Sequence, residues 1–433
     1  MKLRVLSGGK LSGTCSVPGD KSISHRAALI ASLAEGATDI YNYLWGADCI
    51  QTLQCLKKLG VTIEKKDGFI RIMGRGLDGL QEPAEILDAG NSGTTMRLLL
   101  GLLAGQDLFA VLTGDQSLCR RPMGRVITPL TMMGTQIQGR SENRYAPLAI
   151  KGLRQVRPIE YRLPVPSAQV KSAILLAGLK ASGTTTIIQP IPSRDHTERM
   201  LQVFGAPLRI NGKMIHLEGN KGLQGQILQV PGDISAAAFL IVAATLVKGS
   251  EIMIRSVGIN PTRTGVIDVL KMMGAEIELR DVRSWNNEPV ADLLVRSADL
   301  KGTVIEGELL PRVLDEIPVL AVAAAAAQGE TIISDAGELR VKETDRLQAI
   351  TAELRKMKAE IKEEPDGLRI RGSQLEGARV NSWGDHRMAM ALAVAGLIAR
   401  GETIVEDAGC LNISFPAFSD LFKGLGAGID TLN

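Results

Sequence analysis

Short polar segments rich in hydroxyls, amides and cations recur along this sequence. The segments are Asp20-Lys21-Ser22, Asn91-Ser92-Gly93-Thr94, Arg120-Arg121-Pro122, Ser167-Ala168-Gln169, Arg194-Asp195-His196, Arg340-Val341-Lys342-Glu343 and Asp385-His386-Arg387. They fall at the expected starts of helices, where Ser, Asn and Asp are common N-caps. Lys and Arg there oppose the positive end of the helix dipole, so their recurrence indicates that an anion joins them. Backbone N–H groups, hydroxyls and cations together predict a phosphate or carboxylate site.

Two acidic segments could add proton transfer to anion binding. Asp315-Glu316 precedes a long apolar stretch, and both a catalytic base and an ordinary helix-start acid fit it. KETDR, residues 342–346, is expected to place a lysine, a glutamate and an arginine within one helical turn, which surface ion pairs would explain equally well. His386 is the histidine best placed for a site, although a structural role fits it too. Cys119 has no histidine near it in the sequence, so we do not expect a nucleophilic thiol.

Composition and charge exclude several classes of function. The 433 residues suffice for two or three domains, and a net charge of +3 is too small for a general nucleic-acid or membrane binder. The longest apolar runs, Ala236–Val247 and Met388–Ala399, are shorter than the roughly 18 to 20 residues that span a membrane. GRGLDG at 74–79 precedes Gln-Glu-Pro rather than a helix, which argues against dinucleotide binding. Five cysteines without a CxxC pair and an N-terminus without an apolar signal segment predict a protein of the reducing cytoplasm.

One octet recurs six times and reveals the elements that must position these residues. Its copies begin at residues 56, 130, 201, 270, 354 and 422, and each runs from the end of an expected helix through a turn into a strand. Gly occupies the turn position in five copies and Lys358 in the other, as expected where the backbone leaves a helix in the left-handed conformation. A second glycine closes an apolar stretch upstream of each octet. Each repeat therefore predicts helix, strand, helix and strand, with a further hairpin strand in most copies.

The repeats also predict the domains. The sixth copy ends without its last strand, and the chain starts with an unassigned strand, KLRVLSG. We expect the first 17 or so residues to join the sixth repeat, giving one domain of 20–231 and a discontinuous domain of 1–19 plus 232–433. The first helix of each repeat is apolar on all sides, so it should be buried with sheets outside it. The predicted fold class is α/β: a two-domain inside-out α/β barrel of six helix-strand-helix-strand-strand units, three per domain.

Eight motifs resemble those of the 5-enolpyruvylshikimate-3-phosphate synthase family and follow one another over nearly the whole chain. They are PGDKSISHRA at 18, GNSGTTMR at 90, RPMGRV at 121, SAQVKSAILLAGL at 167, NPTRTG at 260, DEIPVLAVAAA at 315, RVKETDRL at 340 and GDHRMAM at 384. The resemblance implies transfer of the enolpyruvyl group of phosphoenolpyruvate to the 5-hydroxyl of shikimate 3-phosphate, with release of phosphate. It implies no metal or organic cofactor, no partners beyond the two small-molecule substrates, and a monomer.

The resemblance also assigns roles to residues, motif by motif. The residues implied for shikimate 3-phosphate are Lys21, Ser22, Arg26, Ser167, Ala168, Gln169, Arg194, Asp315 and Lys342. Those implied for phosphoenolpyruvate are Lys21, Gly93, Arg121, Gln169, Arg346 and Arg387. Asp315 resembles the base at the 5-hydroxyl, and Glu343 with Lys21 the proton-transfer groups. Ile413 stands where many members of the family carry a lysine. Because these residues fall in both expected domains, neither domain alone is expected to hold a complete site.

Two other functions are compatible with parts of the pattern. The sister family transfers enolpyruvyl to UDP-N-acetylglucosamine, but it has Lys-Asn where this chain has Lys21-Ser22, and it uses a loop cysteine that Cys119 does not match. A non-enzymatic scaffold of αβ repeats would not need cations at its helix starts. Release of phosphate from phosphoenolpyruvate in the presence of shikimate 3-phosphate distinguishes all three.

Overall fold

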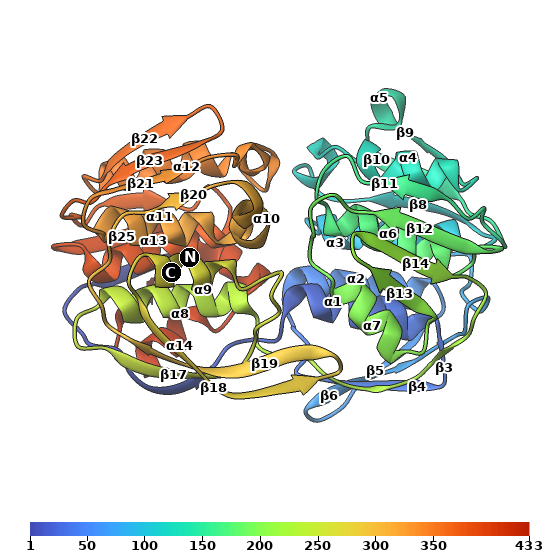
Figure 1. Cartoon of the computed structure of the whole chain (residues 1–433), viewed down its shortest axis with the longest axis horizontal. Helices are drawn as coiled ribbons and strands as arrows, with labels where there is room; N and C mark the ends of the chain where they lie inside the picture. Colours follow the sequence, from blue (N-terminus) through green and yellow to red (C-terminus); the bar gives the residue numbers. More distant parts are fainter. Residues whose placement is uncertain (433) are drawn as a thin grey trace. The chain divides into compact units, whose positions relative to one another are not determined.

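The computed structural model describes residues 1–432, whose contacts divide them into two compact units (Figure 1). The terminal unit, which holds both ends of the chain, consists of Met1–Pro18, Pro231–Arg283 and the chain from Pro289 on. The central unit consists of Gly19–Val230 together with Ser284–Glu288. The chain therefore passes between the units beside each of its two VPGD segments and on both sides of the short stretch 284–288.

The central unit contains three four-stranded sheets of one pattern, in which a parallel pair of strands lies beside an antiparallel pair. In order across each sheet the strands are β7 (Leu87–Asp88), β8 (Phe109–Thr113), β10 (Tyr145–Lys151) and β9 (Gln136–Gly139); β11 (Glu160–Arg162), β12 (Thr184–Ile188), β14 (Met214–Glu218) and β13 (Leu208–Asn211); and β16 (Ile227–Gln229), β4 (Ala37–Tyr41), β6 (Phe69–Met73) and β5 (Thr62–Lys65). A two-stranded sheet of β15 (Leu223–Gln224) and β3 (Ala34–Glu35) completes the unit.

The terminal unit repeats the same pattern three times. Its sheets are β2 (Ser12–Ser16), β17 (Glu251–Gly258), β19 (Glu288–Arg296) and β18 (Glu276–Trp285); β20 (Val304–Ile305), β21 (Glu330–Ile333), β23 (Gly367–Arg371) and β22 (Glu360–Glu364); and β24 (Arg379–Asn381), β25 (Glu402–Glu406), β1 (Lys2–Leu6) and β26 (Gly428–Leu432). The six sheets stay separate, and none formed by residues 1–432 closes into a continuous barrel.

Two repeats take their first strand from a distant part of the chain. β16 pairs in parallel with β4, and β2 pairs in parallel with β17. β1 pairs with β25 of the sixth repeat, with Leu3 opposite Val405. The expectation that the first 17 or so residues join the sixth repeat is thus confirmed for β1 and wrong for β2, which belongs to the fourth. β2 buries only Cys15, so a strand this polar carries no hydrophobic pattern that identifies its partner.

The first helix of each repeat lies inside its unit and is buried almost throughout, as predicted. These helices are α1 (Lys21–Ser32), α3 (Gly93–Ala104), α6 (Ala168–Gly178), α8 (Ile234–Leu246), α11 (Ile317–Ala326) and α13 (His386–Ile398). In the terminal unit α8, α11 and α13 pack against one another, and in the central unit α3 packs against α1 and α6 (Figure 1). Helices on the inside and sheets on the outside confirm the inside-out α/β arrangement.

The second helices end at the turns that the octet predicts. These helices are α2 (Ala47–Lys58), α4 (Gly124–Met132), α7 (His196–Val203), α9 (Gly265–Met272), α12 (Arg346–Lys356) and α14 (Phe418–Gly424), and two single turns are α5 (Arg140–Asn143) and α10 (Leu310–Val313). The turn glycines all have positive φ, for example 101° at Gly134, and Lys358 takes the same conformation with φ 66°. Within residues 1–432, none of the helices combines the length and apolar character that crossing a bilayer requires.

Candidate functional site

In the central unit, α1 begins with the candidate cation Lys21. Asp20 caps the helix by accepting a hydrogen bond from the backbone N–H of Ile23 at 2.9 Å. The Lys21 ammonium forms an ion pair with Asp48, near the start of α2. Lys21 is therefore held by a carboxylate that the sequence prediction omitted. The available signal was an acid in the first turn of the following helix, which is also the most ordinary place for an acid.

Arg26 is buried inside the central unit and joins three helices. Its Nε donates to Thr197 Oγ1 at 2.7 Å, its Nη2 to Ser172 Oγ at 2.9 Å, and its Nη1 to the Ser22 carbonyl at 2.9 Å. Thr197 lies on α7 and Ser172 on α6, so the guanidinium fixes the starts of α1, α6 and α7 relative to one another. Only 3% of Arg26 is exposed. These hydrogen bonds give Arg26 a structural role in holding the three helices together.

The start of α6 is tied to the start of α3. Ser167 caps α6 by accepting from Val170 N at 3.4 Å, and Ala168 is the first residue of the helix. The Gln169 amide accepts from Arg97 Nη1 at 2.6 Å and donates to Thr94 Oγ1 at 3.0 Å. Both partners belong to α3, which begins at Gly93. The structure therefore brings the predicted Gln169 and Gly93 segments together.

Arg121 lies near the same end of α3. Its Nη2 donates to Asn91 Oδ1 at 2.8 Å and to Ser117 Oγ at 3.2 Å. A methyl group on Gly93 would lie 3.6 Å from Arg121 Nη1, so the two predicted residues are neighbours. Arg194 lies just ahead of α7 and is partly buried. Asp195 is the N-cap residue of α7, but its side chain makes no capping hydrogen bond.

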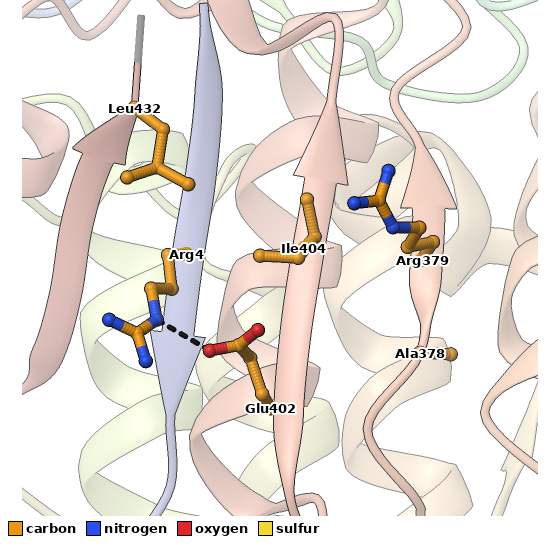
Figure 2. Close-up of a pocket in the computed structure, with 6 residues that line it drawn as sticks. All are labelled: Arg4, Ala378, Arg379, Glu402, Ile404 and Leu432. Carbon is orange, nitrogen blue, oxygen red and sulfur yellow. Dashed lines mark hydrogen bonds and ion pairs between the residues drawn. The ribbon is translucent and has the colours of Figure 1, made fainter.

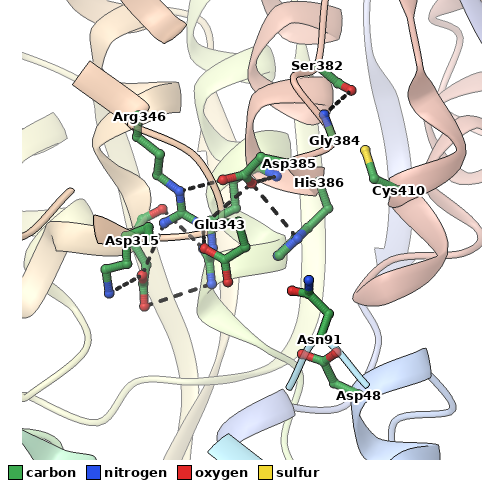
Figure 3. Close-up of polar contacts among 12 residues, drawn as sticks. Asp48, Asn91, Asp315, Glu343, Arg346, Ser382, Gly384, Asp385, His386 and Cys410 are labelled. Carbon is green, nitrogen blue, oxygen red and sulfur yellow. Dashed lines mark hydrogen bonds and ion pairs between the residues drawn. The ribbon is translucent and has the colours of Figure 1, made fainter. Parts of the chain in front are cut away.

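In the terminal unit, Arg346 lies at the centre of a group of carboxylates (Figure 3). Its Nε donates to Asp385 at 2.7 Å, its Nη2 to Glu343 at 2.8 Å and its Nη1 to Asp315 at 3.3 Å. The side chain is only 2% exposed. Burial alone would lower the pKa of Arg346, but Asp385, Glu343 and Asp315 outweigh it and raise the pKa above its ordinary value. The guanidinium therefore stays charged and sets the positions of three acids.

Asp315 in turn is surrounded by cations. Besides Arg346, Lys342 Nζ lies 3.4 Å from Asp315 Oδ1 and Arg387 Nη2 lies 3.9 Å from Oδ2. Arg387 also donates from Nη1 to the backbone carbonyl of Asp315 at 3.1 Å. The structure thus brings together the five residues that the sequence predicted in this unit. Asp315 therefore forms ion pairs with three cations, which fix the position of its carboxylate.

One local prediction about this group is wrong. α12 begins only at Arg346, so residues 342–346 do not form a single helical turn. Asp345 caps the helix by accepting from Gln348 N at 3.1 Å, and Lys342 has an extended backbone. Asp is a strong N-cap, so the helix starts after it and Glu343 reaches Arg346 from the preceding loop.

A separate hollow lies on the outer face of the sheet that contains β1 and β25 (Figure 2). Its lining residues are Arg4, Ala378, Arg379, Glu402, Ile404 and Leu432. Arg4 pairs with Glu402 at 2.5 Å and Arg379 pairs with Glu406 at 3.2 Å, so both cations at the hollow already have acidic partners. None of the predicted site residues lines it.

Comparison with known proteins decides the family. The family model for EPSP synthase (3-phosphoshikimate 1-carboxyvinyltransferase) matches residues 5–422. The chain belongs to the EPSP synthase family. The curated 3-phosphoshikimate 1-carboxyvinyltransferase of Thermoanaerobacter pseudethanolicus is 55% identical over 416 residues, covering 96% of this chain and 98% of the relative. That of Desulforamulus reducens is 52% identical over 416 residues, covering 96% and 97%.

A solved EPSP synthase from Acinetobacter baumannii has the same fold. Its TM-score is 0.90 at 43% sequence identity, and the match covers 100% of both chains. Membership in the EPSP synthase family makes the chain a transferase of the shikimate pathway, which serves aromatic amino acid biosynthesis. The reaction is enolpyruvyl transfer from phosphoenolpyruvate to shikimate 3-phosphate. These matches favour neither the UDP-N-acetylglucosamine enzyme nor the non-enzymatic scaffold.

Proposed function

We propose that the motif residues of this chain bind the two substrates as the family resemblance implies. For shikimate 3-phosphate the proposed set is Lys21, Ser22, Arg26, Ser167, Ala168, Gln169, Arg194, Asp315 and Lys342. For phosphoenolpyruvate it is Lys21, Gly93, Arg121, Gln169, Arg346 and Arg387. Both substrates are multiply charged anions that repel each other, so cations must neutralise them before they can react. Arg26 contributes by holding α1, α6 and α7 in place.

The observation that carries the proposal is the group formed by Arg346, Asp315 and Glu343. It places two carboxylates on one guanidinium, at 3.3 and 2.8 Å, with Lys342 beside Asp315. An acid and a base held this close to fixed cations suit a reaction in which protons move while negative charge is stabilised.

The proposed mechanism is addition followed by elimination. Protonation of the methylene carbon of phosphoenolpyruvate makes its C2 cation-like, and the 5-hydroxyl of shikimate 3-phosphate attacks there while Asp315 accepts the hydroxyl proton. The product of this step is a tetrahedral ketal that still carries the phosphate. Loss of phosphate and removal of a proton from the new methyl group then restore the double bond. Glu343 and Lys21 serve as the proton-transfer groups, and no metal or organic cofactor takes part in this scheme.

The test is phosphate release in a mixture of both substrates. We expect release with shikimate 3-phosphate as acceptor and none with UDP-N-acetylglucosamine. A matched pair of variants, Glu343→Gln and Glu360→Gln, then separates loss of a catalytic group from loss of one negative charge. Glu343→Gln should lower kcat by about 10² or more, the usual scale for losing an acid or base, whereas the exposed Glu360 on β22 should tolerate the change. Equal activity of the two variants would contradict the proposed role of Glu343.

We also propose the domain division 20–231 and 1–19 plus 232–433, a monomer, and a cytoplasmic location. The contact-defined units, which change at Pro18/Gly19 and Val230/Pro231, support the division, with Ser284–Glu288 as an excursion. Light scattering coupled to gel filtration would test the monomer, since a mass near twice 46.3 kDa would indicate a dimer.

A further inference from the structure

Lys171 is a fully buried lysine that none of the proposed roles uses. It lies on α6, two residues after Gln169, and its side chain has no exposed surface. Its ammonium lies 2.7 Å from Glu198 Oε1, 3.0 Å from Gln189 Oε1 and 3.1 Å from the backbone carbonyl of Ser193. The ammonium donates hydrogen bonds to Gln189 and to the Ser193 carbonyl, and Glu198 balances its charge as an ion-pair partner.

All three partners belong to one stretch of chain. Gln189 follows β12, Glu198 lies on α7, and Ser193 immediately precedes Arg194. Lys171 therefore joins α6 to the β12–α7 connection, which carries Arg194, at its start, at Ser193 and at its end in α7. Ser193 immediately precedes Arg194, so a hydrogen bond to the Ser193 carbonyl restrains where the Arg194 backbone lies.

A second contact joins the same two helices one residue further along. Ser172 Oγ lies 2.6 Å from Thr197 Oγ1, and both bond to Arg26. Side chains at 171 and 172 thus connect α6 to α7 directly behind the α6 start, where Ser167 and Gln169 lie.

Stability alone is a poor reason for this arrangement. Taking a lysine and a glutamate out of water costs several kcal/mol for each ion, and apolar residues of similar size often serve stability as well or better. A buried ammonium does what an apolar side chain cannot, because it donates a directed hydrogen bond that fixes a backbone carbonyl.

We propose that Lys171 is a positioning residue for shikimate 3-phosphate, which it serves by holding the Ser193 carbonyl so that Arg194 can reach the substrate. The proposal rests on the role of Arg194 proposed above. Glu198 is part of the same device, since it neutralises the buried ammonium. Substrate affinity, rather than the chemical step, is what the anchor controls.

The experiment measures binding of shikimate 3-phosphate by calorimetry, and steady-state kinetics, in Lys171→Met. We expect its dissociation constant for shikimate 3-phosphate to rise about tenfold or more, with the KM for phosphoenolpyruvate and kcat changed by less than about threefold. The matched control is Lys180→Met, just beyond the other end of α6, where the ammonium pairs with Asp78 at 2.6 Å. Lys180→Met should leave both substrates' constants within about twofold.

The double variant Lys171→Met with Glu198→Met separates positioning from folding. It removes both buried charges, so it should restore much of any stability lost in the single variant while leaving shikimate 3-phosphate binding weak. Recovery of wild-type affinity in the double variant, or equal losses for both substrates in Lys171→Met, would overturn the proposal. Failure of both variants to fold would assign Lys171 to stability and overturn it as well.

Arg194→Ala distinguishes this inference from the proposal on which it rests. If Arg194→Ala leaves shikimate 3-phosphate binding unchanged, the role of Arg194 is wrong and the inference goes with it. If Arg194→Ala weakens binding and Lys171→Met does not, the inference alone is wrong. If Lys171 acts through Arg194, combining the two substitutions should weaken binding little more than Arg194→Ala does.

Discussion

Replacing Asp315 by asparagine removes the proposed base while keeping the shape of the side chain. The carboxylate lies 3.3 Å from Arg346, 3.4 Å from Lys342 and 3.9 Å from Arg387, so its loss leaves three cations without this counter-charge. Arg346 keeps Asp385 and Glu343 as partners, so the buried guanidinium remains paired. The substitution should therefore affect chemistry more than folding.

The expected magnitudes differ for the two kinetic constants. Loss of a general base lowers kcat by about 10² or more, equivalent to a barrier higher by roughly 2.7 kcal/mol. The anionic substrates gain net attraction, because a unit charge about 4 Å away is worth up to roughly 4 kcal/mol near a protein surface. The KM for phosphoenolpyruvate should thus stay constant or fall while kcat drops.

Phosphate release measured over a range of both substrate concentrations gives the two constants. Asp345→Asn is the matched control, since it exchanges the same groups at the α12 cap, and Asn caps a helix about as well as Asp. The control should keep kcat within about threefold. A kcat for Asp315→Asn within about fivefold of wild type would refute the assignment, and so would a raised KM at unchanged kcat.

The remaining predictions concern Gly93, Arg346 and His25. Gly93→Ala places a methyl carbon 2.9 Å from Arg97 Nη1, so the guanidinium must move and the KM for phosphoenolpyruvate should rise about threefold or more in the phosphate assay. Arg346→Lys cannot satisfy three carboxylates and leaves the buried Asp385 poorly paired, so urea unfolding should show a loss of about 3 kcal/mol or more. Burial lowers the pKa of His25 to about 3, so the folded protein keeps it neutral where the unfolded chain, with an ordinary pKa of 6.5, binds a proton. That difference makes stability fall as the pH drops from about 6.5 toward 3, and His25→Gln should flatten the part of the pH dependence that this group causes.

Each of these three has a distinct contrary outcome. An unchanged KM in Gly93→Ala would mean that the α3 start does not face phosphoenolpyruvate. If Arg346→Lys has the same urea midpoint of unfolding as wild type, the carboxylates around residue 346 do not need a guanidinium for stability. An identical pH dependence of stability in His25→Gln and wild type, measured by urea unfolding at pH 5 and 7.5, would place the acid sensitivity elsewhere.

The repeated architecture could be predicted because its signals are local. A helix that ends with a left-handed residue needs a turn there whatever surrounds it, and the octet marks that position even where Lys358 replaces glycine. A helix that is apolar on every side, such as α8, has to be enclosed. Neither inference requires knowledge of which segments meet in space.

The predictions that failed or were incomplete depend on distant partners. The β2 strand is too short and polar to indicate that it pairs with β17, more than 200 residues later. In the same way, the sequence shows Lys21 but not that Asp48 neutralises it, and it shows Arg346 without its burial among acids. An ion pair between segments leaves no periodic pattern in a sequence, so the candidate residues were predictable while their partners were not.

The pairing of the first strands has a consequence for how the chain is made. β1 and β2 precede the central unit in the chain, but their partners β25 and β17 follow only after residues 19–230, which make up nearly all of that unit. The stretch Gly19–Val230 can collapse as soon as β16 emerges, since β16 completes its last sheet. During synthesis β2 remains without its partner until β17 has been made, and β1 remains without its partner until β25 has been made. Completion of the terminal unit therefore requires closure of a loop about 400 residues long between β1 and β25.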